Sequence, residues 1–482
     1  MEIIKLEKVN EVYNKVICEP GVGYEIKDYF TFKVPNYQFM PAYKNKLWDG
    51  NIYLFNPMNC LLYGGLTEQL EIFCKSRDYK LELLSDFSSD NMSVKETLDF
   101  VKSLNLPFQP REYQLEAFVR CVRSRRKMLL SPTGSGKSLI IYLLSRFYNL
   151  RTLIIVPTTS LIHQMASDFL SYGYSDPDNI HKIYQGQDKN IKSQFVISTW
   201  QSIFKQSKDW FNQFDVVIGD EAHLFKAKSL TSIMTKLETC KYRFGFTGTL
   251  DGSETHQLVL EGLFGPVKKI ITTSELIEQK HLSNFMIKCI SLQYPDDIKK
   301  ECSKYSFQQE MDFLVSNQER NKFITNLSLS LKGNTLLLFQ YVDKHGKVLY
   351  DMISNEHSDK DIYFVHGGID GNEREKIRNI VEKNNNSIII ASYGTFSTGI
   401  NIKNLHNIIF SSPSKSKVRN LQSIGRGLRL SDNKEQAVLY DISDDLSWKQ
   451  RKNFTLLHYI ERVKIYNEEQ FEYKTYKINI NT

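Results

Sequence analysis

The 482-residue sequence is 41% hydrophobic and 24% charged, the balance of an ordinary soluble globular protein with about three domains. It has no run of roughly 18 apolar residues that could span a membrane, and its seven scattered cysteines include no CxxC pair, which argues against a zinc cluster or a disulfide framework. The net charge of +7 is uneven: residues 1–100 hold 11 basic and 15 acidic side chains, whereas the remainder holds 51 and 40. A positive excess outside the first hundred residues is expected of a protein that binds phosphates, although alone it is weak support.

Residues 1–100 predict a small α+β domain rich in aromatic side chains. Alternating hydrophobic residues at 30–34 and 51–55 predict short strands, and residues 48–51 are typical of a hairpin turn between them. A helix is predicted at about residues 66–75. The aromatic side chains are expected mainly to fill the core of this domain.

Two α/β lobes are predicted after this domain, at residues 101–285 and 286–450. Near-continuous apolar runs alternate with helical patterns, which is typical of parallel sheets covered by helices on both faces. The runs lie at residues 128–130, 152–156, 195–198, 216–218, 336–339, 362–365, 388–391, 408–410 and 438–440. Residues 451–482 add a predicted helix at 458–471 and a polar, aromatic tail.

A phosphate-binding loop is predicted directly after the first strand of the first lobe. Its residues are Ser131, Pro132, Thr133, Gly134, Ser135, Gly136, Lys137 and Ser138. The glycines let successive N–H groups point at a β-phosphate, and the helix that follows adds positive dipole potential. Lys137 is expected to reach the β- and γ-phosphates of ATP, and Ser138 to hold Mg²⁺. Ser131 stands where the usual pattern has glycine, so a chance Gly/Ser loop is the alternative for this segment in isolation.

A carboxylate pair strengthens the prediction of a nucleotide site. Asp220 and Glu221 follow the apolar strand 216–218, and the carboxyl ends of parallel strands meet at one edge of the sheet. Asp220 is expected to position Mg²⁺, and Glu221 to orient and deprotonate the attacking water. For the tetrapeptide at residues 220–223 considered alone, an exposed acidic turn is the alternative interpretation.

The second lobe has no phosphate loop but carries two arginines, Arg426 and Arg429, within residues 422–429. Their spacing places both guanidinium groups on one helix face, where they could neutralise a γ-phosphate across a cleft between the lobes. For this octapeptide in isolation, a solvated basic helix face is the default interpretation.

The ordered set of motifs resembles the superfamily 2 helicases, with two tandem RecA-like lobes. The matching segments are 108–114, 131–138, 156–161, 198–201, 220–223, 247–249, 393–401 and 422–429. The resemblance implies nucleotide contacts from Arg111, Gln114, Gly399 and Gln422, with Gln114 reading the adenine. It implies that Thr247 and Thr249 couple the nucleotide site to the nucleic-acid face. It also implies nucleic-acid contacts from Pro157, Thr158, Thr199, Trp200, Tyr393 and Thr398, although β-propensity and local capping explain any single threonine nearly as well.

More narrowly, the chain resembles the UvsW-type recombination helicases of T-even-like phages, on segments such as 29–32, 46–50, 61–66, 155–159 and 391–400. This implies an ATP- and Mg²⁺-dependent DNA helicase that acts 3′ to 5′ on forks, recombination junctions, duplex and single-stranded DNA, and RNA–DNA hybrids. It implies a monomeric phage protein in the host cytoplasm, with a DNA-binding accessory domain at residues 1–100. The alternatives are an RNA helicase, a duplex translocase of a restriction system, and a non-catalytic binding module, which the intact Lys137, Asp220 and Glu221 disfavour.

Overall fold

The structure, a computed structural model, describes residues 2–85, 87, 93–224, 227–250, 254–356, 359–399, 402–414, 416–430, 434 and 436–480. It divides into two compact units, one made of residues 1–131 and 136–270 and the other of residues 132–135 and 271–482. Among the described helices, none is both long and apolar enough to cross a membrane. Each unit is described by itself below.

The first unit begins with a small α+β domain. Its main sheet has the order β5-β6-β2-β1-β7, in which β1 pairs antiparallel with β2 and parallel with β7. Its helices and strands are β1 Ile3–Lys8, β2 Tyr13–Ile17, α1 Pro20–Tyr29, β3 Thr31–Lys33, η1 Tyr37–Phe39, α2 Pro41–Lys44, β4 Asn51–Tyr53, β5 Phe55–Asn56, β6 Leu61–Tyr63, η2 Gly64–Leu66, α3 Thr67–Ser76 and β7 Lys80–Leu83. The helix predicted at 66–75 is confirmed as α3, because its apolar side, which includes Leu70 and Phe73, packs on the sheet.

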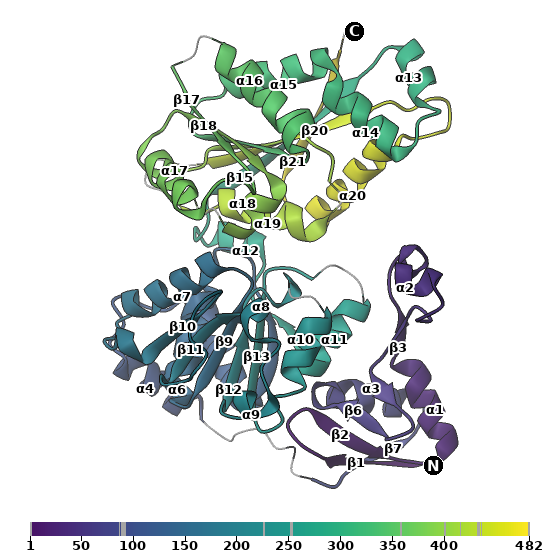
Figure 1. Ribbon diagram of the computed structural model, residues 1–482, viewed down its shortest axis with the longest axis vertical. Helices are drawn as coiled ribbons and strands as arrows, with labels where there is room; N and C mark the ends of the chain where they lie inside the picture. Colours follow the sequence, from purple (N-terminus) through teal and green to yellow (C-terminus); the bar gives the residue numbers. More distant parts are fainter. Residues whose placement is uncertain are drawn as a thin grey trace. The chain divides into compact units, whose positions relative to one another are not determined.

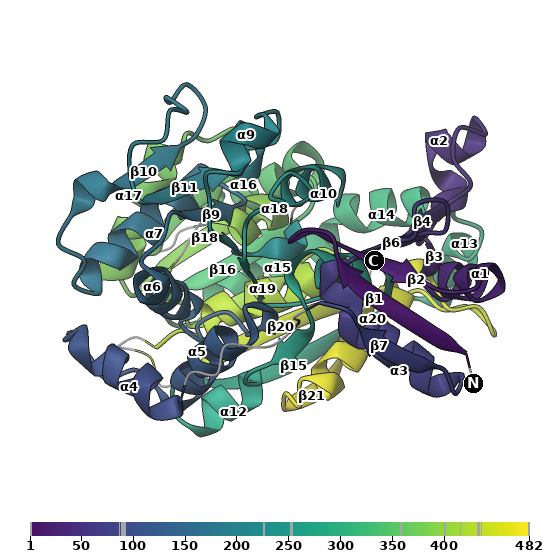
Figure 2. The ribbon, with the colours of Figure 1, turned by 90° about the horizontal axis from the view of Figure 1, so that it is seen from below.

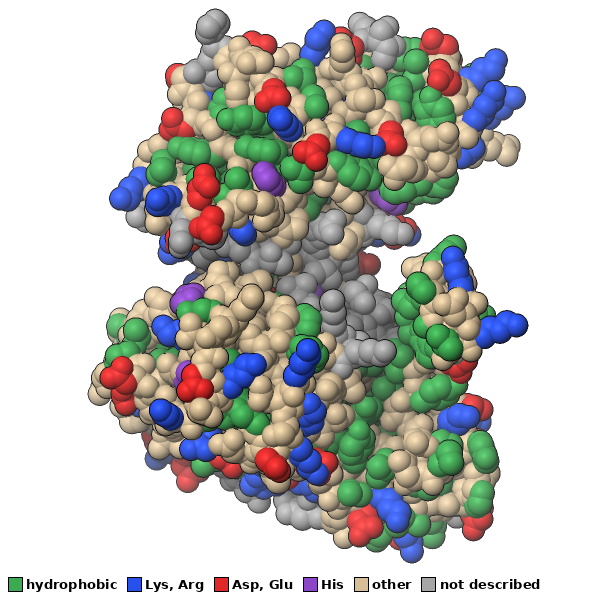
Figure 3. Space-filling view, in the orientation of Figure 1, with side chains coloured by type: hydrophobic (Ala, Val, Ile, Leu, Met, Phe, Trp, Pro, Cys, Tyr) green, Lys and Arg blue, Asp and Glu red, His purple; other side chains and the backbone are tan. Residues whose placement is uncertain are grey.

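An arm formed by β3, η1, α2 and β4 stands away from this sheet in both views (Figures 1 and 2). The strands β3 and β4 pair antiparallel as expected, but the hairpin turn predicted at 48–51 is wrong, because residues 34–50 with two helical turns connect them. Several apolar side chains of the arm are exposed, among them Phe39 at 67% and Leu47 at 81%. Figure 3 shows hydrophobic and basic side chains together on this arm. The aromatics of the domain therefore do not serve its core alone.

The first lobe is built on a seven-stranded, all-parallel sheet with the order β10-β11-β9-β12-β13-β8-β14. Its elements are α4 Val94–Ser103, α5 Glu112–Ser124, β8 Arg126–Leu130, α6 Lys137–Tyr148, β9 Thr152–Val156, α7 Thr159–Ser171, η3 Pro177–Asn179, β10 Ile180–Ile183, β11 Phe195–Thr199, α8 Trp200–Ile203, α9 Lys208–Phe211, β12 Val216–Gly219, η4 Ala222–Leu224, α10 Ala227–Met234, β13 Tyr242–Thr247, α11 Glu254–Phe264 and β14 Val267–Lys269. This confirms the predicted parallel sheet.

Successive residues of the central strands feed two different hydrophobic cores, because side chains alternate across a strand. Ile154 packs with α5, α6 and α7 on one face, whereas Leu153 and Ile155 pack with α8, α9, α10 and α11 on the other. Figure 1 shows α6 and α7 on one side of the sheet and α10 and α11 on the other. Burial on both faces explains why these strands are almost wholly apolar.

The small α+β domain is fixed to the first lobe through α11 and β8. A Cβ atom on Gly65 would lie 1.9 Å from the carbonyl oxygen of Glu261, so only glycine allows this approach. Gln69 donates to the Glu261 carboxylate at 3.2 Å, and the half-buried Arg126 donates to the Glu11 carbonyl at 2.9 Å. Leu258 of α11 is part of the core of the small domain. Both parts of this unit therefore share apolar and polar contacts.

The second unit contains the second seven-stranded, all-parallel sheet, with the order β17-β18-β16-β19-β20-β15-β21. Its elements are α12 Thr273–Glu278, β15 Asn284–Gln293, α13 Asp296–Cys302, α14 Phe307–Ser316, α15 Gln318–Ser330, β16 Thr335–Phe339, the π-helical turn η5 Val342–Gly346, α16 Lys347–Asn355, β17 Asp361–Val365, α17 Gly371–Lys383, β18 Ser387–Ser392, α18 Tyr393–Gly399, β19 Asn407–Phe410, α19 Lys417–Gly427, β20 Gln436–Asp445, α20 Phe454–Glu468 and β21 Tyr473–Asn479. The fold is therefore two tandem RecA-like lobes with a small N-terminal α+β domain.

Two strands of this sheet were not predicted, β15 and β21. The tail predicted after the last helix forms β21, which pairs in parallel with β15 over seven residues. Two buried ion pairs hold the interior of the lobe: Arg320 with Asp444 at 2.8 Å, and Arg462 with Asp441 at 2.7 Å. Both arginines also donate to carbonyl oxygens of residues 411–414, the connection that leads from β19 toward α19.

Candidate active site and nucleic-acid contacts

The predicted phosphate loop joins the carboxyl end of β8 to the first residue of α6, Lys137. Gly134 and Gly136 both adopt positive φ angles, of 86° and 78°, the left-handed region that favours glycine. A Cβ atom on Gly136 would also lie 2.4 Å from the Gln114 side-chain nitrogen. The backbone bends here as a loop must if its N–H groups are to surround a phosphate.

Lys137 lies against the carboxylate pair. Its Nζ is 3.3 Å from a Glu221 carboxylate oxygen and donates to the Ser131 carbonyl oxygen at 3.3 Å. β8 and β12 are separated in the sheet only by β13, so their carboxyl ends bring residues that lie 84 positions apart in the sequence into contact. The structure thus brings together Lys137, Asp220 and Glu221, as expected from the parallel sheet.

The two carboxylates differ in their titration. Burial, reinforced by the neighbouring charge of Glu221, raises the pKa of Asp220 to about 7. Burial also acts to raise the pKa of Glu221, but the charges of Lys137 and His223 outweigh it and lower this pKa. Glu221 also has a φ angle of 49°, which is uncommon for a non-glycine residue and costs roughly 1 kcal/mol or more. The lowered pKa keeps Glu221 ionised at neutral pH, the form in which a carboxylate can orient water and accept a proton from it.

A chain of side-chain contacts leads from Glu221 to Thr247 and Thr249, the residues expected to couple the nucleotide site to the nucleic-acid face. His223 Nδ1 lies 3.5 Å from the Glu221 carboxylate and 2.5 Å from the Thr247 hydroxyl. The Thr247 hydroxyl in turn donates to the Thr249 carbonyl at 2.8 Å. The Thr249 hydroxyl is buried without a hydrogen-bond partner among the described residues. His223 was not among the residues predicted to act, although it is the fourth residue of the motif that begins at Asp220.

The residues expected to contact the nucleotide base lie beside the phosphate loop. Gln114 is 5% exposed and its side-chain oxygen accepts from the Arg111 N–H at 2.9 Å, while the Arg111 guanidinium donates to the Tyr113 hydroxyl at 2.9 Å. This contact fixes the start of α5 near Gly136. The Ser138 hydroxyl is 2.7 Å from that of Tyr172, a partner that the sequence did not indicate.

The residues present fit a magnesium ion. Ser138 supplies a hydroxyl and Asp220 a buried carboxylate, and Mg²⁺ prefers one or two such oxygen ligands together with phosphates and water. The raised pKa of Asp220 is consistent with this use, because a nearby divalent cation would favour its ionised form. Among the described residues, no cluster of three or more His, Cys, Asp or Glu side chains could hold a metal by itself.

In the first lobe, the expected nucleic-acid contacts gather at the carboxyl ends of the adjacent strands β9 and β11. Thr199 pairs in register with Val156, and Gln201 donates to the Pro157 carbonyl at 3.5 Å. Thr158 is half-buried, with its hydroxyl 3.1 Å from that of Ser160. Thr199 is 6% exposed, and its hydroxyl is hydrogen-bonded to that of Ser202 at 2.9 Å. Trp200 is half-buried at the start of α8.

In the second lobe, Tyr393 departs from the expectation. Its side chain is 2% exposed and its hydroxyl donates to the Ser412 carbonyl at 3.1 Å, so a contact with nucleic acid there would come from its backbone. Thr398 and Gly399 lie in α18, but the side chain of Thr398 is outside the described residues.

Of the two predicted arginines, Arg426 lies in α19, whereas Arg429 lies after the helix, so the expectation that both share one helix face is not met. Gln422 is 6% exposed and Arg429, just after the helix, is half-buried, whereas the Arg426 side chain is outside the described residues. Ser283 fixes the carboxyl end of this segment, because its N–H donates to the Leu428 carbonyl at 2.8 Å and its hydroxyl to the Arg429 carbonyl at 3.2 Å.

Lys434 fixes the same end from another direction. It is 6% exposed, and its Nζ donates to the Gly427 carbonyl at 2.8 Å and to the Lys403 carbonyl at 3.0 Å. It therefore joins α19 to the segment that follows α18. Burial and the charge of Arg429 lower its pKa to about 8. A single lysine in a polar stretch gave no sequence signal for this role.

Comparison with known proteins identifies relatives over the whole length. Three family models match: "DNA helicase UvsW, N-terminal" over residues 4–84, "Type III restriction enzyme, res subunit" over 107–252 and "Helicase conserved C-terminal domain" over 319–431. The chain is 35% identical to the ATP-dependent DNA helicase uvsW of Enterobacteria phage T4, covering 97% of each. It is 26% identical to the DNA 3′-5′ translocase XPB2 of Sulfurisphaera tokodaii, covering 69% of this chain and 81% of the relative. The crystal structure of T4 UvsW matches with a TM-score of 0.52 at 33% identity, covering 99% of this chain and 100% of that one.

Proposed function

The chain belongs to the UvsW family of ATP-dependent DNA helicases, and we propose that it uses ATP to unwind and branch-migrate forked and recombination-junction DNA, moving 3′ to 5′. The observation that carries the chemical half of this proposal is the contact of Lys137 with Glu221, beside Asp220, at one edge of a parallel sheet. Relatives of the chain are named as a DNA helicase and a DNA 3′-5′ translocase, which supports the choice of DNA and the direction.

In the proposed reaction, the phosphate loop and Lys137 bind the triphosphate, and Gln114 with Arg111 meets the adenine. Ser138 and Asp220 would hold Mg²⁺, which supplies charge neutralisation of the β- and γ-phosphates when bound. Glu221, whose pKa is lowered, orients the attacking water and accepts its proton. Gly399 and Gln422 add further contacts to the nucleotide.

Arg426 and Arg429 are proposed to complete the pocket from the second lobe. Their guanidinium groups would offset the charge that develops on the γ-phosphate, and loss of that phosphate would release the lobes from each other. The contacts of Ser283 and Lys434 to the end of α19 support this, because an arginine acts on a transition state only if its backbone is held.

Movement requires a grip on DNA that does not depend on sequence. Pro157, Thr158, Thr199 and Trp200 are proposed to hold one strand by its phosphates, with Thr398 and the backbone of Tyr393 from the second lobe. The contacts of His223 with Glu221 and Thr247 support coupling, because they give hydrolysis a physical route toward Thr247 and Thr249.

The N-terminal domain is proposed to bind the duplex or branched part of the substrate. Its arm presents Phe39 and Leu47 to solvent, together with Lys33, Lys44 and Lys46, a mixture that suits unpaired bases and phosphates at a junction. Its attachment to α11 supports a role in positioning the substrate on the first lobe. The substrates are proposed to include single-stranded DNA and RNA–DNA hybrids, and the protein to act as a monomer in the host cytoplasm.

One substrate panel tests the proposal. ATP turnover should be measured with single-stranded DNA, duplex DNA, a fork, a four-way junction, an RNA–DNA hybrid and RNA, and strand displacement with 3′ or 5′ tails. Stimulation should be strongest with fork and junction DNA, and displacement should need a 3′ tail. Stronger stimulation by RNA would favour an RNA helicase, and stimulation by duplex without strand displacement would favour a translocase; either result would refute the proposal.

A further inference from the structure

The second lobe carries a tight turn whose chemistry no motif explains. It follows β20 and comprises residues 446–453, with Trp448, Lys449, Gln450 and Arg451 at its tip. The N–H of Trp448 donates to the Arg451 carbonyl at 3.0 Å and the N–H of Arg451 to the Trp448 carbonyl at 3.1 Å. Lys449 turns the chain with a φ angle of 53°. These residues, with Ser303, line an open surface hollow of about 520 Å³.

The turn is held rigidly at its base. The N–H of Leu446 donates to the Asn453 side-chain oxygen at 3.0 Å, and the Asn453 amide donates to the buried Glu310 carboxylate at 2.9 Å. Glu310 also accepts the N–H of Thr455 at 2.7 Å, at the start of α20. A loop fixed in this way loses little further conformational entropy when it binds a ligand.

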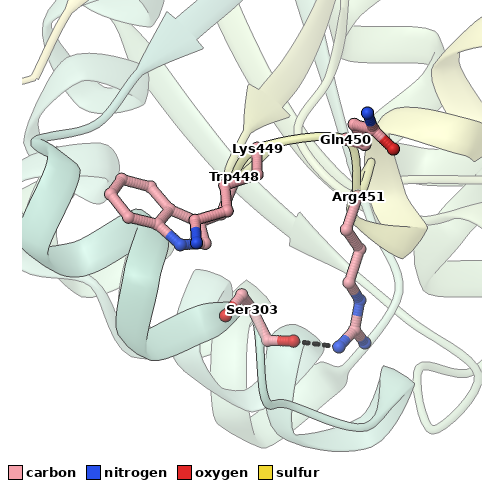
Figure 4. Close-up of a pocket in the computed structure, with 5 residues that line it drawn as sticks. All are labelled: Ser303, Trp448, Lys449, Gln450 and Arg451. Atoms are coloured by element: carbon pink, nitrogen blue, oxygen red, sulfur yellow. Dashed lines mark hydrogen bonds between the residues drawn. The ribbon is translucent and has the colours of Figure 1, made fainter.

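The side chains of Trp448 and Arg451 form two sides of the hollow, with Ser303 between them (Figure 4). The Arg451 guanidinium donates to the Ser303 carbonyl, and to the Tyr305 carbonyl at 3.2 Å. Arg451 therefore secures the wall of the hollow. The half-buried indole of Trp448 borders the same space.

The surroundings are basic. Lys449, Arg451 and Lys452 are exposed within four consecutive residues, and so are Lys300 in the last turn of α13 and Lys304 just after that helix. Two acidic side chains flank these segments: Glu301 of α13 accepts a hydrogen bond from the Tyr305 hydroxyl at 2.6 Å, and Asp445, just before the turn, accepts the Ser447 N–H at 3.1 Å. An aromatic face beside exposed ammonium groups fits a base together with its phosphates.

The turn also lies at the edge of the sheet where the proposed strand grip begins. All strands of this sheet are parallel, so the connection after β20 and the helix α18 after β18 leave the same edge. Two strands, β16 and β19, separate β18 from β20, which places these strands roughly 14 Å apart across the sheet. β20 continues three residues past the level at which β18 ends, so a strand of nucleic acid that contacts both must also span roughly 10 Å or more along the strand direction.

We propose that the Trp448 turn is an additional contact for single-stranded DNA, in which a base stacks on the indole while Lys449 and Lys452 hold the flanking phosphates. This inference rests on the proposed function, since it assumes that the motor holds a DNA strand. The bound DNA enters the hollow beside Trp448 and is held without regard to its sequence, because every base has a stacking face.

The test compares affinity for an oligothymidylate of twenty nucleotides by fluorescence anisotropy in the full chain. Trp448→Ala should weaken binding about tenfold, within the 1–3 kcal/mol that base stacking contributes. The double variant K449A/K452A should lower the slope of log affinity against log salt by about 1.4, or roughly 0.7 for each lost phosphate contact. The matched control K474A/K477A removes the same charge from exposed positions of β21 and should leave the slope unchanged.

A second measurement does not depend on the stability of the variants. An oligonucleotide containing 5-iododeoxyuridine should photo-cross-link to the peptide that contains Trp448. Wild-type affinity of W448A, or no cross-link in residues 446–453, would overturn the proposal and favour an acidic protein segment as the occupant. DNA-stimulated ATP turnover by the wild type tests the proposed function independently of the Trp448 turn. ATP turnover without DNA should be the same in W448A as in the wild type.

Discussion

Replacing Asp220 with asparagine should abolish ATP turnover and at the same time make the protein without nucleotide more stable. Burial raises the pKa of Asp220 from its ordinary value of 3.8 to about 7. At 1.36 kcal/mol per pKa unit, ionising this group in the folded protein costs about 4 kcal/mol. In the wild type the Asp220 carboxylate accepts the N–H of Glu221 at 2.9 Å. An asparagine side chain has nearly the same shape and can accept the same hydrogen bond, but it carries no charge.

The sign of the pH dependence follows from the direction of the shift. Because the folded protein holds this proton more tightly than the unfolded chain, the stabilisation is fully present below pH 3.8 and is lost as the pH rises to about 7. The gain from Asp220→Asn should therefore be about 1.7 kcal/mol at pH 5 and complete above about pH 7.5. For a lobe of this size, about 4 kcal/mol corresponds to a rise in Tm on the order of 10 °C.

Thermal unfolding followed by fluorescence, at pH 5, 6, 7 and 8.5 without nucleotide or Mg²⁺, measures this effect. Asp178→Asn, which removes a charge from an exposed position on η3, is the matched control and should leave Tm unchanged at every pH. A Tm for D220N that is equal to or below that of the wild type at pH 8.5 would refute the reasoning, because it would mean that ionised Asp220 carries no burial cost.

Four further outcomes are expected. Lys137→Ala should eliminate ATP turnover, and retention of most activity would remove the assigned phosphate site. Arg429→Ala should leave ATP affinity nearly intact while lowering kcat roughly 10³-fold or more, and a pure loss of affinity would contradict a transition-state role. His223→Ala breaks the contact with Thr247 and should reduce DNA stimulation of turnover more than turnover without DNA; an equal loss in both would exclude coupling through this contact. Burial lowers the pKa of Lys434 from 10.5 to about 8, so the folded protein should become more stable as the pH rises from 8 to 10.5. The Tm of the wild type relative to that of K434M should therefore rise over this range. A constant difference between the two Tm values would contradict the burial of a charged lysine.

The central strands could be predicted from sequence because both of their faces are buried. The run at 152–156 coincides with β9, and Asp220 follows β12 as expected, so the parallel arrangement alone places Lys137 near the carboxylates. The strand β15 was missed because Lys288 interrupts its apolar pattern, and its partners β20 and β21 lie well over a hundred residues later in the chain. β21 reads as a polar tail because it is an edge strand whose residues are mostly exposed.

The contacts that tune the site could not be predicted in the same way. Thr247 follows His223 by 24 positions, and only the order of β12 and β13 in the sheet brings the two side chains together. The hairpin turn at 48–51 was predicted from local turn residues, which carry no information about the seventeen residues that separate β3 from β4. Tyr393 was assigned to nucleic acid by its motif, whereas its burial follows from packing against residue 412.

The order of strands in the second sheet sets a delay during synthesis. β15 is made early, yet both of its neighbours, β20 and β21, come from residues 436–479. At about 5–20 residues per second, the ribosome needs roughly 7–30 s to reach β20 after completing β15. Throughout that interval an apolar ten-residue strand has both edges open, while the first lobe and its small domain can already fold. The second lobe therefore cannot complete its sheet until residues 436–479 have been made.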